Sequence, residues 1–142
     1  GRISEGIQEK LILGNLKAFR DWGFAGDYVH GMWLMMQHDI PEDWVLATGE
    51  SHSVQDFLDI AFNYLNLDPE KYVESSDRYF RPNEVDYLLG DSSKASKKLN
   101  WTPETDFESL VKMMVDSDLK LAKQEKTLIN EGLLKPTWDN FS

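Results

Sequence analysis

The chain contains no cysteine, which excludes disulfide bonds, thiolate metal sites and cysteine nucleophiles. Its three histidines, at positions 30, 38 and 52, show neither the spacing nor the accompanying carboxylates of a metal site. No apolar run approaches the roughly 18 residues that a membrane-spanning helix needs, and no secretory signal opens the sequence. We therefore expect a soluble, cytoplasmic protein that has no metal site and no membrane partner.

Positive charge is scarce too. The 142 residues include 15 Lys and Arg against 25 Asp and Glu, which gives a formal net charge of -10. This field disfavours a nucleic acid or an anionic membrane as the main partner, although a local pair of arginines can still bind a phosphate. The length and an ordinary share of apolar residues predict one compact domain with a modest core.

The local patterns of catalysis are missing as well. A nucleophile with its base, a metal set or a glycine-rich phosphate loop would each leave a recognisable signature. Gly14, Gly23, Gly26 and Gly31 are scattered and do not follow a strand in the G-x-G-x-x-G manner. Pairs of carboxylates are frequent, but in so acidic a chain we interpret them as solvated surface. We predict no catalytic residue, no metal ligand and no cofactor-binding residue in this chain.

Hydrophobic periodicity predicts two units in which a strand precedes a helix. The first has a strand at 10–13 and a helix behind an N-cap at Asp27. That helix is apolar nearly all round, so it is expected to be buried. The second has a buried strand at 44–49 and an amphipathic helix behind a capping box formed by Ser53 and Asp56.

Two more helices are expected, at about 93–99 and behind a second capping box at 105–108, and the pattern turns polar from residue 120 onward. Two strand-then-helix units with further helices predict an α/β fold that is rich in helices. The expected core anchors include four tryptophans, Trp22, Trp33, Trp44 and Trp101.

Two arginines on predicted loops carry the binding signal. Arg81 precedes Pro82, which restricts the arginine to extended backbone, and Glu84 follows. Arg20 lies between a predicted strand and a helix start, where loops often carry function. A guanidinium can fork onto phosphate oxygens, and a carboxylate can accept hydrogen bonds from ribose hydroxyls. Together these residues resemble a two-point grip on a nucleotide diphosphate, although either arginine alone fits a surface ion pair equally well.

Several short segments, spread along nearly the whole chain, occur in an order that is typical of one family. They are G-N-L at 14–16, R-D-W-G at 20–23, D-Y-V at 27–29, M-W-L-M at 32–35, A-T-G-E-S-H-S-V at 47–54, Y-F-R-P-N-E-V-D at 79–86, G-D at 90–91 and L-N-W-T-P at 99–103. In this order they closely resemble the C-terminal half of the GDP-mannose 4,6-dehydratase family, over about residues 2–121.

The resemblance implies a fold and a reaction. The fold is the C-terminal part of an extended short-chain dehydrogenase/reductase, helix-rich with a few short, mostly parallel strands and without the N-terminal Rossmann half. Members of the family bind NADP and GDP-mannose, oxidise the sugar at C4, eliminate water across C5 and C6, and return the hydride to C6. The product is GDP-4-dehydro-6-deoxy-mannose, so the enzyme is a hydro-lyase.

It also implies roles for single residues. By position, Arg20 and Arg81 lie against the diphosphate, and Glu84 reaches the ribose. Gly14 and Asn15 lie near the guanine end of the ligand. Lys17 departs from the family, which usually has aspartate at this place before R-D-W-G.

The family's cofactor loop, its Tyr-x-x-x-Lys pair and its catalytic threonine and glutamate belong to an N-terminal half that has no counterpart here. We therefore expect a substrate-binding fragment that is inactive alone, with NADP bound mainly by the absent half. We divide it into a substrate-binding region, 1–121, and a polar helix end with a tail, 122–142.

Two other functions stay open: a stand-alone GDP-sugar binding or regulatory module without catalysis, and a part of a related GDP-sugar epimerase or reductase. The expected partners are GDP-mannose, the missing half and further copies of the chain. Self-association is expected because the apolar helix at 28–36 and the strand at 44–48 would lie exposed without the absent domain.

Overall fold

The computed structural model describes residues 1–80, 83 and 85–135. In chain order the elements are β1 (Leu11–Leu13), β2 (Phe19–Arg20), α1 (Ala25–Met36), β3 (His52–Ser53), α2 (Val54–Tyr64), α3 (Pro69–Tyr72), β4 (Val73–Ser75), the 3-10 helix η1 (Asp77–Tyr79), α4 (Ser93–Leu99) and α5 (Phe107–Asn130). Helices dominate and the strands are short, which confirms the predicted helix-rich α/β class. Helix α5 continues through the boundary predicted between residues 121 and 122.

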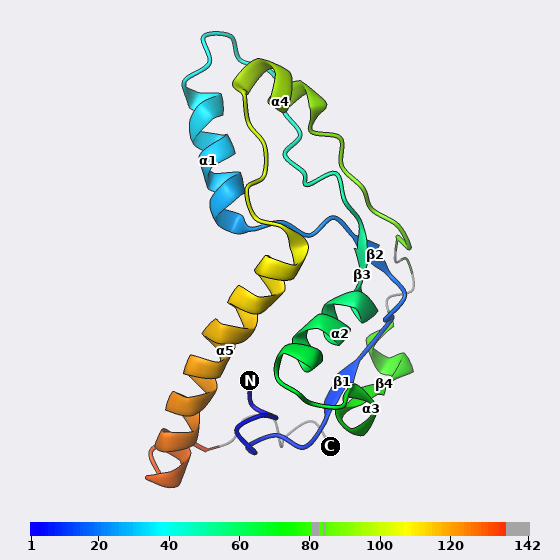
Figure 1. The fold of residues 1–142 in the computed structure, drawn as a ribbon, viewed down its shortest axis with the longest axis vertical. Coiled ribbons are helices and arrows are strands. Elements are labelled where there is room, and N and C mark those ends of the chain that lie inside the picture. Colours follow the sequence, from blue (N-terminus) through cyan, green and yellow to red (C-terminus); the bar gives the residue numbers. More distant parts are fainter. Residues whose placement is uncertain (81–82, 84, 136–142) are drawn as a thin grey trace.

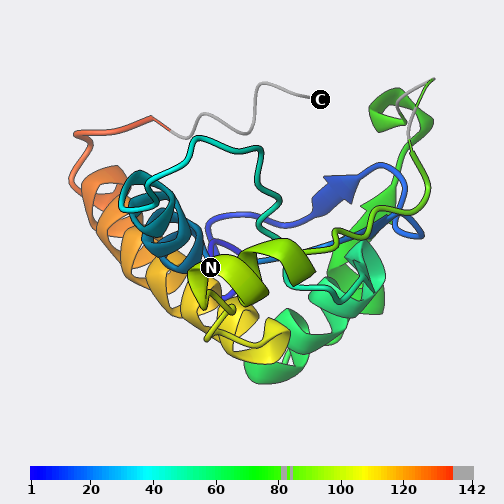
Figure 2. The same ribbon diagram turned by 90° about the horizontal axis from the view of Figure 1, so that it is seen from above.

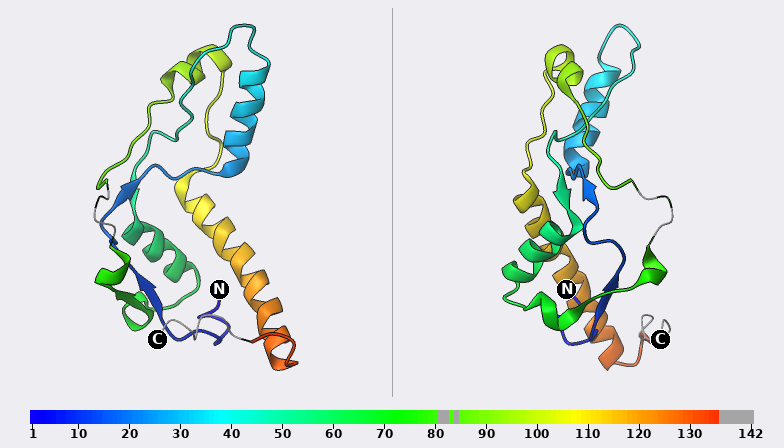
Figure 3. Two further views of the ribbon diagram at one scale, coloured as in Figure 1. Left: turned by 180° about the vertical axis from the view of Figure 1, so that it is seen from behind. Right: turned by 90° about the vertical axis from the view of Figure 1, so that its right-hand side faces the viewer.

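The elements form an elongated molecule with two ends (Figure 1). Helices α1 and α4 pack against each other at one end, and α2, α3, β1 and β4 gather toward the other. Helix α5 starts between the two ends and runs away from α1 and α4, as the views from behind and from the side also show (Figure 3). Seen from above, α5 and the strands diverge from the junction where α2 meets the start of α5 (Figure 2).

Two small sheets connect distant parts of the chain. Strand β1 pairs with β4 in parallel, and β2 pairs with β3 in antiparallel fashion. A further parallel bridge joins Phe19 to Tyr87, so the segment after residue 84 lies along the free side of β2. Two of these three pairings are parallel, in line with the prediction of short, mostly parallel strands.

The core lies between α2 and α5, because each helix presents one apolar face to the other. Phe107, Val111 and Val115 of α5 are buried. The partly buried side chains packed against them are Trp22, Phe57, Ile60, Ala61, Leu65 and Leu119. The structure confirms the apolar face predicted for α2, whereas on α5 Met114, which belongs to the same apolar pattern as Val111 and Val115, is 44% exposed.

One predicted cap is confirmed and another is shifted by a residue. Ser53 Oγ accepts a hydrogen bond from Asp56 N at 3.0 Å, and Ser53 N donates to Asp56 Oδ2 at 2.8 Å, which is the predicted capping box. Helix α5 instead begins after Asp106, whose carboxylate accepts from Ser109 N at 2.8 Å. The prediction of a cap at Thr105 is therefore wrong, because Thr105 N donates to Asp27 Oδ2 at 3.0 Å outside the helix.

Helix α1 also differs from its prediction. Its N-cap is Phe24, and Asp27 lies in the first turn, where Oδ2 accepts from the backbone of residues 104 and 105. The helix was expected to be buried, yet its one buried residue is Gly31, which lies against Leu46 and Trp101. Along the rest of α1, large apolar side chains are exposed, namely Val29, Met32, Trp33 and Met36.

The predicted strand at 44–49 is not formed within the described residues. This stretch has no ladder partner there, and a strand requires one. Glu42, which lies just before this stretch, is paired with two lysines of α4. The ion pair with Lys94 measures 2.8 Å and the one with Lys98 measures 2.7 Å. Hydrogen bonds from both lysines lower the pKa of Glu42 to about 2. The two lysines therefore tie α4 to the residues before this stretch.

Candidate functional site

The side chain of Arg20 is held in part by the segment that begins at Val85. Its Nη1 donates to the carbonyl oxygens of Phe19 and Val85, each at 2.7 Å. The guanidinium of Arg20 therefore lies beside Val85, the residue that follows Glu84 in the sequence. Arg81 and Glu84 themselves lie outside the described residues, so their predicted contacts stay predictions.

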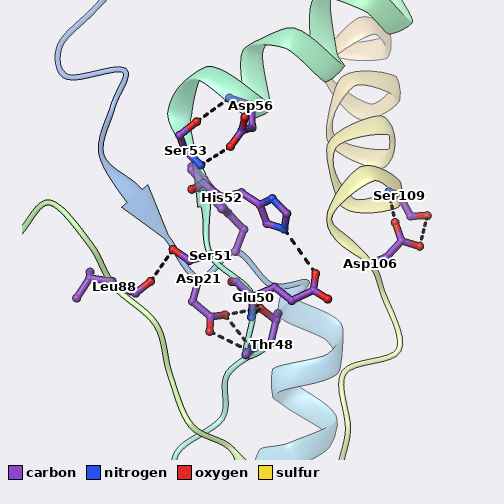
Figure 4. A network of polar contacts seen from close by, with 12 residues as sticks. Asp21, Thr48, Glu50, Ser51, His52, Ser53, Asp56, Leu88, Asp106 and Ser109 are labelled. Carbon is purple, nitrogen blue, oxygen red and sulfur yellow. Dashed lines mark hydrogen bonds and ion pairs between the residues drawn. The ribbon is translucent and has the colours of Figure 1, made fainter.

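Backbone pairing fixes this segment along β2. Phe19 N donates to Asp86 O at 2.7 Å, and Leu88 N donates to Phe19 O at 3.1 Å. The rings of Phe19 and Tyr87 lie 5.7 Å apart. On the other side, Ser51 Oγ donates to Leu88 O at 3.0 Å (Figure 4). Residues 85–88 are thus attached to both β2 and the residues before β3.

Gly14 and Asn15 have clear local roles. A side chain at Gly14 would collide with the carbonyl of Tyr79, so glycine allows β1 and η1 to approach closely. Gly14 O also accepts from Ser75 Oγ at 3.1 Å. Asn15 Oδ1 accepts from Lys17 N at 2.9 Å, which forms a turn. These contacts place both residues near the segment that leads to Arg81, and their binding of a guanine stays a prediction.

The aspartate beside Arg20 is a functional candidate that sequence reasoning missed. Asp21 Oδ1 accepts from Thr48 N at 2.8 Å and from Thr48 Oγ1 at 2.6 Å, and Oδ2 accepts from Gly49 N and Gly90 N at 3.1 Å each (Figure 4). Burial alone raises the pKa of Asp21, but these hydrogen bonds outweigh it and hold that pKa below its ordinary value. Four donors therefore stabilise the ionised carboxylate.

The other two residues of R-D-W-G pack the motif against the core. Trp22 Nε1 donates to His52 O at 3.0 Å, and its ring lies 5.2 Å from that of Phe57. The imidazole of His52 stacks on Phe107 at 3.9 Å between ring centroids. Gly23 lies against the hydroxyl of Tyr28, where a Cβ would not fit. The motif thus joins the Arg20 loop firmly to the start of α5.

Three cavities lie away from Arg20. One of ≈ 410 Å³ lies between α2 and α5 and is lined mainly by apolar side chains. Two others, of ≈ 200 and ≈ 480 Å³, share Glu50, His52, Asp106 and Phe107. Their carboxylates disfavour an anionic ligand. The two hollows beside His52 are therefore unsuited to a diphosphate.

The described residues contain neither a metal site nor a membrane-spanning helix. No three His, Asp or Glu side chains there are placed to hold a metal ion. No helix in that part of the chain is both long and apolar enough to cross a membrane.

Sequence comparison gives a consistent family. The family model described as GDP-mannose 4,6 dehydratase matches residues 1–114. GDP-mannose 4,6 dehydratase 2 of Arabidopsis thaliana is 60% identical over 134 residues, which cover 94% of this chain and 36% of the plant protein. GDP-mannose 4,6 dehydratase of Homo sapiens is 42% identical over 139 residues, covering 86% of this chain and 37% of the human protein. The chain thus spans just over a third of the length of these relatives.

Solved structures show the same fold. RMD from Pseudomonas aeruginosa complexed with NADPH superposes with a TM-score of 0.71 at 14% identity, over 81% of this chain and 38% of that one. dTDP-glucose 4,6-dehydratase from Bacillus anthracis in complex with NAD gives 0.72 at 16% identity, over 84% of this chain and 36% of that one. These superpositions confirm the predicted fold class.

Proposed function

Because the chain belongs to the GDP-mannose 4,6-dehydratase family, we propose that it forms the GDP-mannose-binding part of such an enzyme. The complete enzyme would convert GDP-mannose to GDP-4-dehydro-6-deoxy-mannose with NADP, as a hydro-lyase. The observation that carries the proposal is the position of Arg20. Its guanidinium donates to the carbonyl of Val85, which follows Glu84 in the sequence.

The chemistry of Arg20 suits this ligand. A guanidinium carries five N–H donors in a planar fork, which matches the oxygens of a diphosphate. The Nη1 bonds to the carbonyl oxygens of Phe19 and Val85 help to set the direction of this fork. A preset direction lowers the entropy that the side chain loses on binding.

The described residues do not fit the nicotinamide cofactor. A dinucleotide loop needs glycines that let a phosphate approach the backbone. Gly14, Gly23, Gly31 and Gly90 are instead in close contact with other parts of this chain, where a Cβ would collide, and the open glycines, Gly6, Gly49 and Gly132, are far apart in the sequence. We therefore assign the cofactor, NADP, to the part of the enzyme outside this chain, and we predict that the chain alone does not dehydrate GDP-mannose. A cytoplasmic location remains a prediction as well.

The test is a calorimetric titration of the 142-residue chain with GDP and GDP-mannose. We expect binding, and Arg20→Ala should weaken it by about tenfold or more, because a charge-assisted hydrogen bond contributes roughly 1.5–3 kcal/mol. Arg2→Ala is the matched control, since it removes the same charge from a side chain that pairs with Glu125 on α5. Equal affinity of Arg20→Ala and the wild type would overturn the proposal.

A second experiment separates this function from a stand-alone binding module. The chain is mixed with the remaining part of a homologous dehydratase, and NADP-dependent dehydration is measured. Activity of the mixture supports an enzyme part, whereas binding without activity in a folded mixture favours the module. A related GDP-sugar epimerase or reductase would show its own product in the same assay.

A further inference from the structure

We propose that Asp21 is a positioning residue that sets the direction of the Arg20 guanidinium toward the diphosphate of a nucleotide ligand. Asp21 does so by holding the segment of residues 85–90, which supplies a carbonyl partner of Arg20. The inference rests on the proposed function, in which Arg20 binds the diphosphate, and it adds a residue that touches neither ligand nor reacting atoms.

The segment 85–90 is attached to residues 19–21 along its whole length. At its start, the carbonyl of Val85 accepts from Arg20 Nη1 at 2.7 Å. In its middle, Asp86 O and Leu88 N bond to Phe19 at 2.7 and 3.1 Å. At its end, Gly90 N donates to Asp21 Oδ2 at 3.1 Å. Arg20 and Asp21 therefore hold opposite ends of one segment.

Asp21 also joins this segment to a third part of the chain. Besides Gly90, it accepts from the backbone of Thr48 and Gly49, which lead into β3 (Figure 4). Gly90 lies so close to Ala47 that a side chain would collide there, and Ala47 is buried. The end of the segment is thus fixed against a packed surface, and the carboxylate of Asp21 closes the contact.

A carboxylate suits this role because it only accepts hydrogen bonds. All four partners of Asp21 are donors, three backbone N–H groups and the hydroxyl of Thr48. Alanine at this position would leave these donors without their acceptor. An asparagine keeps one acceptor oxygen, but its amide group would face donors on the other side. Loss of the carboxylate therefore releases the end of the segment and, through Val85, the direction of Arg20.

The experiment compares Asp21→Ala with Asp27→Ala in the 142-residue chain. Asp27 is the matched control, because its carboxylate also accepts two backbone N–H groups but ties α1 to residues 104 and 105. GDP and GMP are titrated by calorimetry, and the Nε–Hε resonance of Arg20 is followed by NMR without ligand. Asp21→Asn serves as a second, milder variant, and circular dichroism confirms that each variant is folded.

We expect Asp21→Ala to weaken GDP binding by about tenfold, equal to about 1.4 kcal/mol, and to reduce the preference for GDP over GMP. The Arg20 resonance should shift, and Asp21→Asn should lie between the wild type and alanine. Asp27→Ala should leave the GDP preference and the Arg20 resonance unchanged. An unmoved Arg20 resonance in Asp21→Ala, or equal changes in both alanine variants, would overturn the inference. If the wild type binds no GDP, the proposed function fails, while the resonance still decides whether Asp21 positions Arg20.

Discussion

The two helix pairs of this molecule bury their apolar side chains to very different extents. Between α2 and α5, Val111 is fully buried and Phe107 is 8% exposed. At the other end, α1 packs on α4, yet Val29 is 62% and Met36 81% exposed. Both regions have apolar residues at helical spacing, so the spacing alone does not distinguish them.

The difference teaches that α1 is covered on one side only, although its sequence is apolar nearly all round. Its packed side consists of Gly31 against Leu46 and Trp101, a close approach that only glycine permits. Its other side exposes Val29, Met32, Trp33 and Met36, whose spacing of three and four residues puts them on one helical face. A contiguous apolar surface of this kind marks an interface. The chain spans 36% of the length of its plant relative, and we expect the remaining part of such an enzyme to cover this face.

The contrast between packed and exposed apolar side chains is tested most strongly by two tryptophans at the same end of the molecule. Trp101 is 1% exposed and donates to Asp27 O at 2.9 Å, whereas Trp33 is 58% exposed on α1. Trp101→Ala should lower the free energy of unfolding by about 3–5 kcal/mol because it leaves a cavity. Trp33→Ala should change it by about 0.5 kcal/mol. Urea denaturation measures both, and similar losses would show that the face of α1 is packed.

Asp21 holds together the connections that lead to α2 and α4, at residues 48–49 and 90, and its charge makes this contact sensitive to pH. Its pKa is lower in the folded chain than in the unfolded one, so the carboxylate stabilises the fold above about pH 3.9, and this contribution is lost as the pH falls through the folded pKa. Asp21→Asn should cost about 1–3 kcal/mol at neutral pH.

This cost should shrink as the wild type is acidified, because the protonated aspartate resembles the amide. Thermal unfolding of both proteins between pH 7 and pH 3 measures the difference. The other carboxylates titrate in both proteins and cancel from it. A constant difference across this range would mean that the charge of Asp21 is not what holds the link.

The exposed face of α1 should also drive self-association. Met32→Lys with Met36→Lys should weaken it by about tenfold, equal to about 1.4 kcal/mol. The added positive charge reduces the repulsion between chains of net charge -10, so weaker association must come from the lost apolar surface. Met113→Lys with Met114→Lys, on exposed positions of α5, is the control. Sedimentation velocity decides, and a monomeric wild type would contradict the prediction.

The sequence predicted the core better than the surface of the site. Phe107, Val111 and Val115 of α5, spaced four residues apart, follow one helical face, and a face of that kind is buried wherever a second helix covers it. The stretch at 44–49 had the composition of a strand, but a strand also needs a neighbour to pair with, and the described residues supply none. The role of Asp21 was hidden because its donors come from residues 48, 49 and 90, far apart in the sequence.

The start of each packed helix gives the smallest test, because the sequence predicted capping boxes at both Ser53 and Thr105. Ser53 accepts from Asp56 N, so Ser53→Ala should lower the free energy of unfolding by about 1 kcal/mol. Thr105→Ala should have little effect, because Thr105 contributes its backbone N–H to Asp27 and Asp106 caps α5 instead. Asp106→Ala should lower the free energy of unfolding, whereas Thr105→Ala should not. If Thr105→Ala were as harmful as Ser53→Ala, the side chain of Thr105, and not that of Asp106, would be the cap of α5.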